Sequence, residues 1–369
     1  MTRIDYSTDV PKHYVRRNGW LSACQQQART VKKRSKKIPL RYFTFCAADA
    51  IDVFMLEREG ILKRSSETGR LEGVFFCEAD EDAFGKIADL IGSPEQGFLG
   101  QFEKIVLFKD DRDTEGRDLY GQEDEYYPED VRKKLRYKDA HKRFKAEFPF
   151  DIINLDVFGI MFPPRRAVIA PLVESLIEIL KWQTGSAFPN GKLCKQFTLF
   201  LTSHIDHTKT DQEAIRQLTN RVAENIDSNV NFRSAFLESY GHQEATRLAR
   251  ENFAEFFCLA LPKFLIHLAL FDLGWDVNYG PSYLYNREDI YVKGQYYQIM
   301  HSISAYIRVP DFRHRLDAPG TGMYTRAVTQ LINDGVIWID ETVENPEISR
   351  ELQTDLTSIV EFREQYRAR

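Results

Sequence analysis

The residues best suited to chemistry end an apolar run at positions 148–159, FPFDIINLDVFG. The run finishes with two hydrogen-bond acceptors, Asn154 and Asp156, followed by the ring of Phe158 and by Gly159. Ligands of open α/β sheets bind outside the carboxyl ends of the strands, so this ending places polar groups and a ring where a reaction would occur. Asn154 shares the strand face of Asp156 and either assists it or caps the strand end. We predict that this segment forms part of a functional site.

Strands and helices alternate on both sides of this segment. Apolar runs predict five strands, at residues 41–46, 73–77, 104–108, 150–155 and 197–202. Helical spacing between them predicts amphipathic helices, of which the clearest carries Phe84, Ile87, Ala88 and Ile91. This repeated alternation predicts an α/β fold built on a doubly wound, mostly parallel, Rossmann-like sheet.

The rest of the chain adds helices to this sheet. Apolar spacing predicts a helical region at residues 210–273, and partial alternation predicts a closing strand at residues 296–309. The tail is predicted to form a helix, a short strand and a final helix. We therefore divide the chain into a basic N-terminal segment (1–39), a main domain (40–309) and a small C-terminal helical module (310–369).

A charged insertion, residues 109–147, separates the predicted third and fourth strands. It is either a solvated helical excursion or a contact surface for nucleic acid or a protein partner, because loops of this length inside a sheet are usually functional or disordered. Its tyrosines and cations would offer stacking and phosphate contacts side by side: Tyr126, Tyr127, Arg132, Lys133, Lys134, Arg136 and Tyr137. The basic residues 32–37 extend this hypothesis, although a solvated segment before the first strand is the favoured interpretation there.

Composition excludes several classes of protein. Hydrophobic residues make up 43% and charged residues 28%, which is typical of a globular chain, and the formal net charge of -5 excludes uniform coating of nucleic acid. The five cysteines are widely spaced and without a Cys-x-x-Cys pair, as expected of reduced cytosolic thiols. The start lacks an apolar signal segment, and the longest apolar run, 264–271, is far shorter than the ~20 residues of a membrane span. We therefore predict a cytoplasmic protein without a membrane span.

In the order of these elements and in short motifs, residues 40–309 resemble the class I S-adenosylmethionine-dependent methyltransferases. The nearest resemblance is to the three-Cys-motif partner family and to the tRNA guanine dimethyltransferases. Their fourth strand ends Asp-Pro-Phe-Gly, where this chain has Asp156, Val157, Phe158 and Gly159. The resemblance implies that Asp156 holds a flat acceptor nitrogen while Phe158 stacks on the substrate. Val157 in place of the rigid proline removes the fixed carbonyl geometry.

The same resemblance implies that S-adenosylmethionine binds at the carboxyl ends of the first two strands, with its adenine near the end of the third. Glu78 would accept hydrogen bonds from the ribose hydroxyls, and Asp110 would bind the adenine amino group. The first loop has Thr44, Ala48 and Ala50 where those families have an aspartate and two glycines, and alanine tolerates positive φ poorly. This loop is therefore either a degenerate cofactor site or a tightly packed turn without a ligand.

Two functions follow from these residues. The first is S-adenosylmethionine-dependent methyl transfer, with nucleic acid as one class of acceptor. The second is a catalytically degenerate methyltransferase fold, a pseudoenzyme that serves as a binding or scaffold subunit of a bacterial defence or modification complex. Fold resemblance alone does not establish activity, so the altered first loop is the feature that separates the two.

A third group of residues has the chemistry of metal ligands. His204, Asp206 and His207 follow the predicted fifth strand within four positions of one another. No further cluster of ligands accompanies them, so a polar loop is the favoured interpretation and no metal is predicted.

Overall fold

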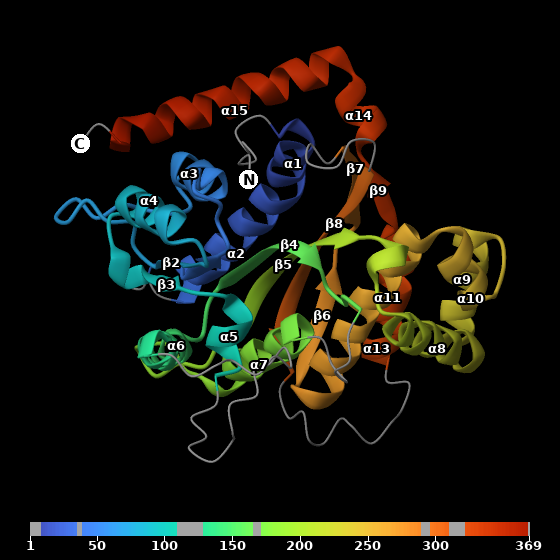
Figure 1. Ribbon diagram of the computed structural model, residues 1–369. Helices are drawn as coiled ribbons and strands as arrows, with labels where there is room; N and C mark the ends of the chain where they lie inside the picture. Colours follow the sequence, from blue (N-terminus) through green and yellow to red (C-terminus); the bar gives the residue numbers. More distant parts are fainter. Residues whose placement is uncertain are drawn as a thin grey trace.

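The computed structural model describes residues 9–34, 39–108, 128–164, 171–288, 296–309 and 322–367. These residues form a nine-stranded, mostly parallel sheet. Helices lie on both sides of this sheet (Figure 1). The strands are β1 (Tyr42–Thr44), β2 (Val74–Glu78), β3 (Gly97–Leu99), β4 (Ile152–Ile160), β5 (Gln196–Ile205), β6 (Trp275–Tyr279), β7 (Ser282–Glu288), β8 (Tyr296–Arg308) and β9 (Val336–Trp338). Their spatial order is β3-β2-β1-β4-β5-β8-β7-β9, and β6 pairs with β8.

The first five strands run parallel to one another. The next strand, β8, is antiparallel to β5, β6 and β7, and β9 pairs in parallel with β7. The predictions of β1, β2, β4, β5 and β8 are confirmed, apart from their exact ends. Because β1 lies between β2 and β4, the carboxyl ends of these three strands meet at one edge of the sheet.

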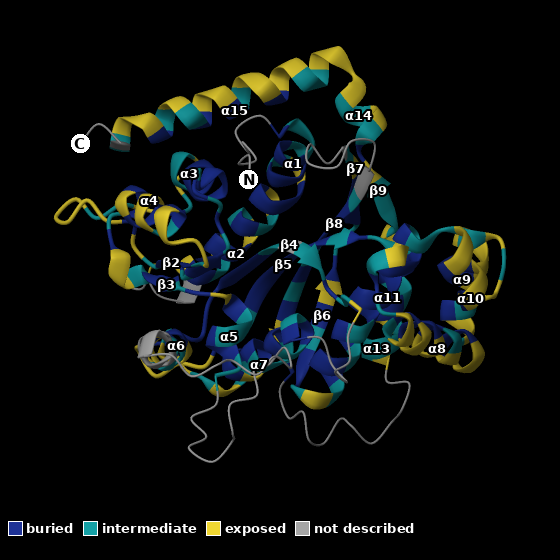
Figure 2. Ribbon diagram, in the orientation of Figure 1, coloured by how far each residue is buried: buried dark blue, intermediate teal, exposed yellow. Residues whose placement is uncertain are grey.

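Helices cover both faces of the sheet. One face carries α1 (Val10–Val15), the π-helical η2 (Arg16–Trp20), α2 (Leu21–Arg34), α3 (Ile51–Arg58), α4 (Glu81–Ile91) and α15 (Pro346–Arg367). The other carries α5 (Phe102–Val106), α6 (Pro128–Ala146), α7 (Pro171–Gly185), α8 (Gln212–Ser228), α9 (Val230–Tyr240), α10 (Ala245–Glu251), α11 (Phe253–His267) and α13 (Gly322–Asp334). Successive strand residues supply the two cores in turn: Tyr42 and Val74 face the first group, and Phe43 and Phe75 the second. The central strands are accordingly buried in Figure 2.

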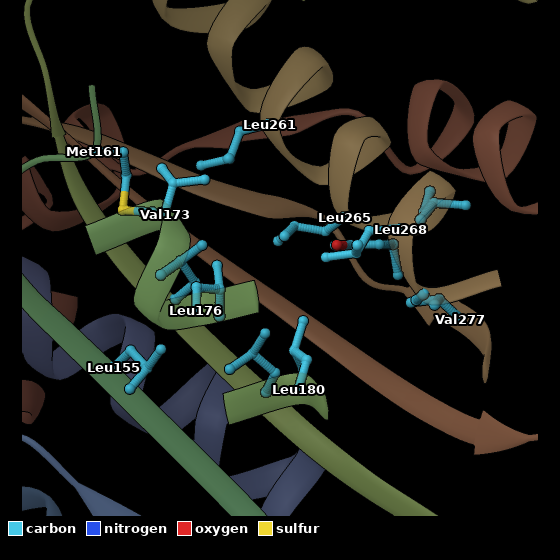
Figure 3. Close-up of a cluster of buried hydrophobic side chains, with 14 of the residues drawn as sticks. Leu155, Met161, Val173, Leu176, Leu180, Leu261, Leu265, Leu268 and Val277 are labelled. Atoms are coloured by element: carbon cyan, nitrogen blue, oxygen red, sulfur yellow. The ribbon is translucent and has the colours of Figure 1, made fainter. Parts of the chain in front are cut away.

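The second core gathers side chains of β4, α7 and α11, among them Leu155, Leu176 and Leu265 (Figure 3). α11 continues into the π-helical η5 (Leu268–Asp272), and the combined helix is long and apolar enough to cross a membrane. However, 78% of its apolar window is buried inside the protein. The helix is therefore packed as a core helix of this fold.

The predicted third strand at residues 104–108 is wrong. Helix α5 covers residues 104–106 of this stretch, and strand β3 lies just before the helix. Phe102, Ile105 and Val106 are buried and recur at helical spacing, which explains the helix. β3 can pack at the sheet edge because its first residue is Gly97. A Cβ atom at this position would lie 2.5 Å from Cζ of Phe76 and would clash with it.

Both ends of the described chain contribute to the first core, where Trp20 and Leu356 join Tyr42. In Figure 1, α15 crosses over α3 and α1. Asp355 of α15 bonds Nε2 of His13 on α1 (2.8 Å) and Nη2 of Arg58 on α3 (2.7 Å). Burial acts to raise the pKa of Asp355, but the hydrogen bonds from His13 and Arg58 outweigh it and lower this pKa to about 2. These contacts join α15 to α1 and α3.

Candidate functional site

A cavity of about 280 Å³ lies at the carboxyl ends of β1, β2 and β4. Glu78 and Asp156, two of the residues predicted from the sequence, line this cavity. Five further polar residues reach it from α1, β5 and β7, namely Lys12, Thr202, His204, Tyr285 and Arg287. The sheet therefore brings a predicted cofactor residue and a predicted catalytic residue to one site.

Glu78 is the last residue of β2, which pairs with β1 on one side and β3 on the other. Its Oε1 accepts the backbone N–H of Asp80 (2.8 Å), and Asp80 caps α4 by accepting the N–H of Ala83 (2.8 Å). The turn from β2 to α4 thus holds the Glu78 carboxylate at the strand end, where the sequence predicted it.

Thr44, predicted to bind the cofactor, belongs to a buried hydrogen-bond network. Its hydroxyl donates to Oδ2 of Asp52 (2.9 Å), and the hydroxyl of Tyr42 donates to the same oxygen (2.6 Å). Nδ2 of Asn154 donates to Tyr42 (3.0 Å), Thr44 (3.3 Å) and Asp52 (3.2 Å). The amide of Asn154 is therefore directed to β1 and α3, and neither Thr44 nor Asn154 lines the cavity.

Ala48 and Ala50 are also buried beside the cavity, which this loop lines with Phe45, Cys46 and Ala47. Ala50 has φ 45° and ψ 35°, which is a left-handed conformation. Among the described residues other than glycine, Ala50 alone has a positive φ. The loop therefore keeps, at Ala50, a backbone conformation that glycine would adopt without steric strain.

We expect Ala50→Gly to raise the free energy of unfolding by about 1 kcal/mol, because glycine adopts the left-handed conformation without the Cβ clash. Ala48→Gly is the matched control, since the φ of Ala48 is not positive. There, glycine only adds freedom to the unfolded chain and should lower the free energy by roughly 0.5 to 1 kcal/mol. Urea unfolding measures both values, and a loss of stability in both variants would contradict strain at Ala50.

The loop is braced by the C-terminal helix. Nη1 of Arg363, whose side chain is 5% exposed, donates to Oδ1 of Asp49 (3.0 Å) and to the backbone oxygen of Asp49 (3.1 Å). α15 therefore anchors the loop at Asp49, the residue directly before Ala50.

Asp156 lies where β4 departs from regular pairing. It pairs with Thr202 of β5, whereas Ile160 pairs with His204, so four residue steps on β4 match two on β5. Strand irregularities of this kind redirect side chains and are common beside functional sites. The strand was predicted to end at residue 155, but it continues through the irregular segment to Ile160.

Lys12 of α1 forms an ion pair with Asp156, from Nζ to Oδ2. The lysine side chain is 8% exposed and the aspartate side chain 16%. Burial acts to raise the pKa of Asp156, but the charge and hydrogen bond of Lys12 outweigh it and hold this pKa below its ordinary value. Asp156 is therefore an ionised acceptor at neutral pH, and it already accepts a hydrogen bond from a nitrogen.

The Asp156 end of the cavity is rich in cations. Arg287 lines it and donates from Nη1 to Asp9 (2.8 Å). Arg16 follows Lys12 by one helical turn, and its charge also lowers the pKa of Asp156. Arg16 is 4% exposed, and no group in the described part of the chain accepts a hydrogen bond from its Nε or Nη1. At this end of the cavity three cations, Lys12, Arg16 and Arg287, thus accompany the carboxylates of Asp9 and Asp156, and this excess of positive charge favours an anionic ligand.

His301 of β8 supports the wall of the cavity. Its Nδ1 lies 2.7 Å from the hydroxyl oxygen of Thr202, and its Nε2 lies 3.3 Å from that of Tyr285. The ring also stacks on Tyr285, with 5.5 Å between the centroids. Burial lowers the pKa of His301 to about 3, so the ring is neutral at neutral pH. His301 therefore orders two side chains that line the cavity.

Some predicted site residues cannot be placed. Asp110 lies outside the described residues with the rest of 109–127, and the side chains of Phe158 and of the cations at 132–134 are not described. Tyr137, farther along α6, contacts the turn after β3, where its hydroxyl accepts the N–H of Gln101 (3.4 Å). This contact occupies one of the rings that the sequence offered for stacking on nucleic acid.

The three potential metal ligands, His204, Asp206 and His207, have different surroundings in the structure. His204 lines the cavity from β5. Asp206 caps the short helix η4 (His207–Lys209), and the ring of His207 contacts Phe253, with 4.9 Å between the centroids. The polar-loop interpretation fits this arrangement.

The N-terminal helix is the main part of the site that the sequence analysis missed. Lys12 and Arg16 look like members of a solvated basic segment, because cations are rarely buried. A helix signal was nevertheless present: Asp9 precedes Val10-Pro11 and accepts the N–H of Lys12 (3.1 Å) as the N-cap. Four-residue spacing then places Lys12 and Arg16 on one face of the helix.

The model of the PP_RS20740-like family matches residues 134–359, more than half of the chain. The chain belongs to this family. The matched range runs from α6 to α15 and includes Asp156, Thr202 and Arg287, whereas Lys12 and Glu78 precede it. No curated protein and no solved structure matches the chain. The chemistry of the site is therefore argued from its own residues.

Proposed function

We propose that the protein is a class I methyltransferase-like protein that binds S-adenosylmethionine in the strand-end cavity and presents an acceptor nitrogen to Asp156. The observation that carries the proposal is that Glu78 and Asp156 line one cavity. Glu78 offers a carboxylate to the ribose hydroxyls, and the left-handed Ala50 keeps a glycine-like turn in the adjacent loop. When bound, the cofactor supplies an electrophilic methyl group.

The arrangement of the sheet supports this proposal. The order β3-β2-β1-β4-β5 is that of the first five strands of a Rossmann sheet, and helices pack on both faces, so we infer a doubly wound, Rossmann-like fold. The order reverses between β1 and β4, and open α/β sheets bind ligands at such a switch point. The cavity lies beside this reversal.

We further propose nucleic acid as the acceptor substrate and the cytoplasm as the location. The cations around Asp156 would contact phosphates, which position a nucleic acid without reading its sequence. Asp156 accepts a hydrogen bond from Nζ of Lys12. An exocyclic amino group of the nucleic acid would take the place of this lysine as the nitrogen donor to Asp156. Lys12 would then be available to the phosphate backbone.

The second candidate is a catalytically silent scaffold subunit of a defence or modification complex. The observation that favours it is the Lys12–Asp156 pair itself, because a lysine of this chain occupies the carboxylate that an acceptor needs. In that case residues 109–147 are the first region to test as a surface for a protein partner. Binding of cofactor and absence of transfer would both be compatible with this candidate.

Titration calorimetry with S-adenosylmethionine tests the cofactor site. We expect saturable binding to the wild type, and Glu78→Gln should weaken it roughly 10- to 100-fold because a charge-assisted hydrogen bond contributes ~1.5 to 3 kcal/mol. Glutamine keeps an oxygen for the N–H of Asp80, so the turn should stay folded. Glu81→Gln, an exposed change on α4, is the matched control. Absence of heat with the wild type at millimolar cofactor would refute the cofactor proposal.

A further inference from the structure

A second cavity, of about 770 Å³, lies between α8, α11 and α13, away from the strand-end cavity. These helices gather at one end of the molecule, opposite α4, in Figure 1. The walls of the cavity are built from Arg221, Glu224, Asn225, Lys263, Phe271 and Tyr324, with further side chains from α9. None of them contributes to the site described above.

Lys263 is the unusual member of this cavity. It lies in the middle of the apolar helix α11 and is 3% exposed. No hydrogen bond or ion pair joins its ammonium group to the described part of the chain, although buried charges are normally paired. Burial lowers the pKa of Lys263 to about 8, so the amine is still largely protonated at neutral pH.

The two nearby charges act on Lys263 in opposite directions, since Glu224 raises its pKa and Arg221 lowers it. Arg221 and Glu224 on α8 pair with each other, with 3.3 Å between Nη1 and Oε2. The glutamate is therefore already committed to a cation at the rim. One buried positive charge is left facing the cavity, which favours a ligand with one negative group.

One wall of the cavity is aromatic. His267, one turn after Lys263, contacts Phe271 and Tyr324, with 4.8 Å and 6.1 Å between ring centroids, and Phe271 contacts Tyr324 at 5.2 Å. We call these three rings the aromatic wall. Burial lowers the pKa of His267, so the wall carries no charge at neutral pH. Flat rings of this kind bind a flat apolar group.

The wall is held in place by hydrogen bonds between helices. The hydroxyl of Tyr324 and the side-chain amide of Asn225 exchange hydrogen bonds of 3.2 and 3.3 Å. Nδ2 of Asn229 donates to the hydroxyl oxygen of Thr325 (3.1 Å). These bonds join α13 to the neighbouring helices and order the cavity before any ligand arrives.

We propose that this cavity binds a small organic anion with a flat apolar body, whose anionic group pairs with Lys263 and whose body contacts the aromatic wall. Carboxylates, sulfonates and phosphate monoesters share this chemistry. The proposal does not depend on methyl transfer or on the strand-end cavity.

The test uses two dyes on the full chain: 8-anilinonaphthalene-1-sulfonate, which is a flat anion, and N-phenyl-1-naphthylamine, which is its uncharged counterpart. We expect saturable binding of the sulfonate at one site, weakened roughly 10- to 100-fold by Lys263→Met. The same variant should bind the uncharged dye as the wild type does. Lys263→Arg should keep sulfonate affinity within a few-fold because it keeps the charge.

The controls separate charge from folding. Lys181→Met removes an exposed lysine on α7 and should leave sulfonate binding unchanged. Methionine keeps the apolar stem of Lys263, so Lys263→Met should unfold at or above the wild-type temperature. Unchanged sulfonate affinity in Lys263→Met, or no saturable sulfonate binding to the wild type, would overturn the proposal.

Discussion

Asp156→Asn is expected to lower the free energy of unfolding by about 3 kcal/mol. Its side chain and that of Lys12 are 16% and 8% exposed, so the change takes away the carboxylate that compensates a buried ammonium group. Removing one partner of a buried ion pair typically costs ~3 to 5 kcal/mol, far more than the loss at an exposed pair. Urea unfolding followed by circular dichroism measures the difference.

The double variant Lys12→Met/Asp156→Leu is the critical control. Replacing both charges by apolar groups of similar size leaves neither member of the pair without its partner, so stability should return to near the wild-type value. Glu213→Gln removes one partner of an exposed pair with Arg216 and should have no measurable effect. If Asp156→Asn is as stable as the wild type, the pair is not a structural link between α1 and β4.

The same pair predicts a pH dependence. The pKa of Asp156 is lowered in the folded protein, so its contribution to stability is present above the unfolded value of about 4 and disappears as the pH falls through the folded value. The wild type should therefore lose more stability than Lys12→Met/Asp156→Leu when the pH is taken below about 4.

The parts of the fold that the sequence predicted are those in which one local pattern decides the structure. β2 and β4 are apolar on both faces, because helices cover both sides of the sheet, and they stand out as continuous runs. β3 has only three residues and begins with Gly97, so no run marks it, while the apolar residues of α5 resemble a strand when they are read over five positions.

The site was predictable where a side chain follows directly from a strand end. Glu78 and Asp156 line the cavity because the backbone of the sheet carries them there. Lys12 and Arg287 reach the same place from the N-terminal helix and from β7, and a contact over 144 residues between Lys12 and Asp156 leaves no local pattern. Asn154 shares a strand face with Asp156, but its side-chain amide donates hydrogen bonds to Thr44 and Asp52 and does not line the cavity.

A transfer assay with radiolabelled S-adenosylmethionine tests the proposed chemistry, with total RNA, DNA and cell protein as acceptors. If the wild type is active on one of these, Asp156→Asn should reduce the rate roughly 10²- to 10⁴-fold, since it removes the charged acceptor for the substrate nitrogen. Phe158→Ala should also slow transfer if the ring stacks on the substrate, as its place in the sequence predicts.

Loss of stability must be separated from loss of chemistry in this assay. Lys12→Met/Asp156→Leu is expected to fold like the wild type and yet to transfer no methyl group, because it lacks the acceptor carboxylate. It should still bind S-adenosylmethionine with wild-type affinity, since Glu78 is unchanged, whereas Glu78→Gln should lose affinity and keep turnover at saturating cofactor. A double variant as active as the wild type would refute the role of Asp156. A wild type that binds the cofactor but labels none of the three acceptors would instead favour the scaffold, in which Lys12 permanently occupies the carboxylate that catalysis needs.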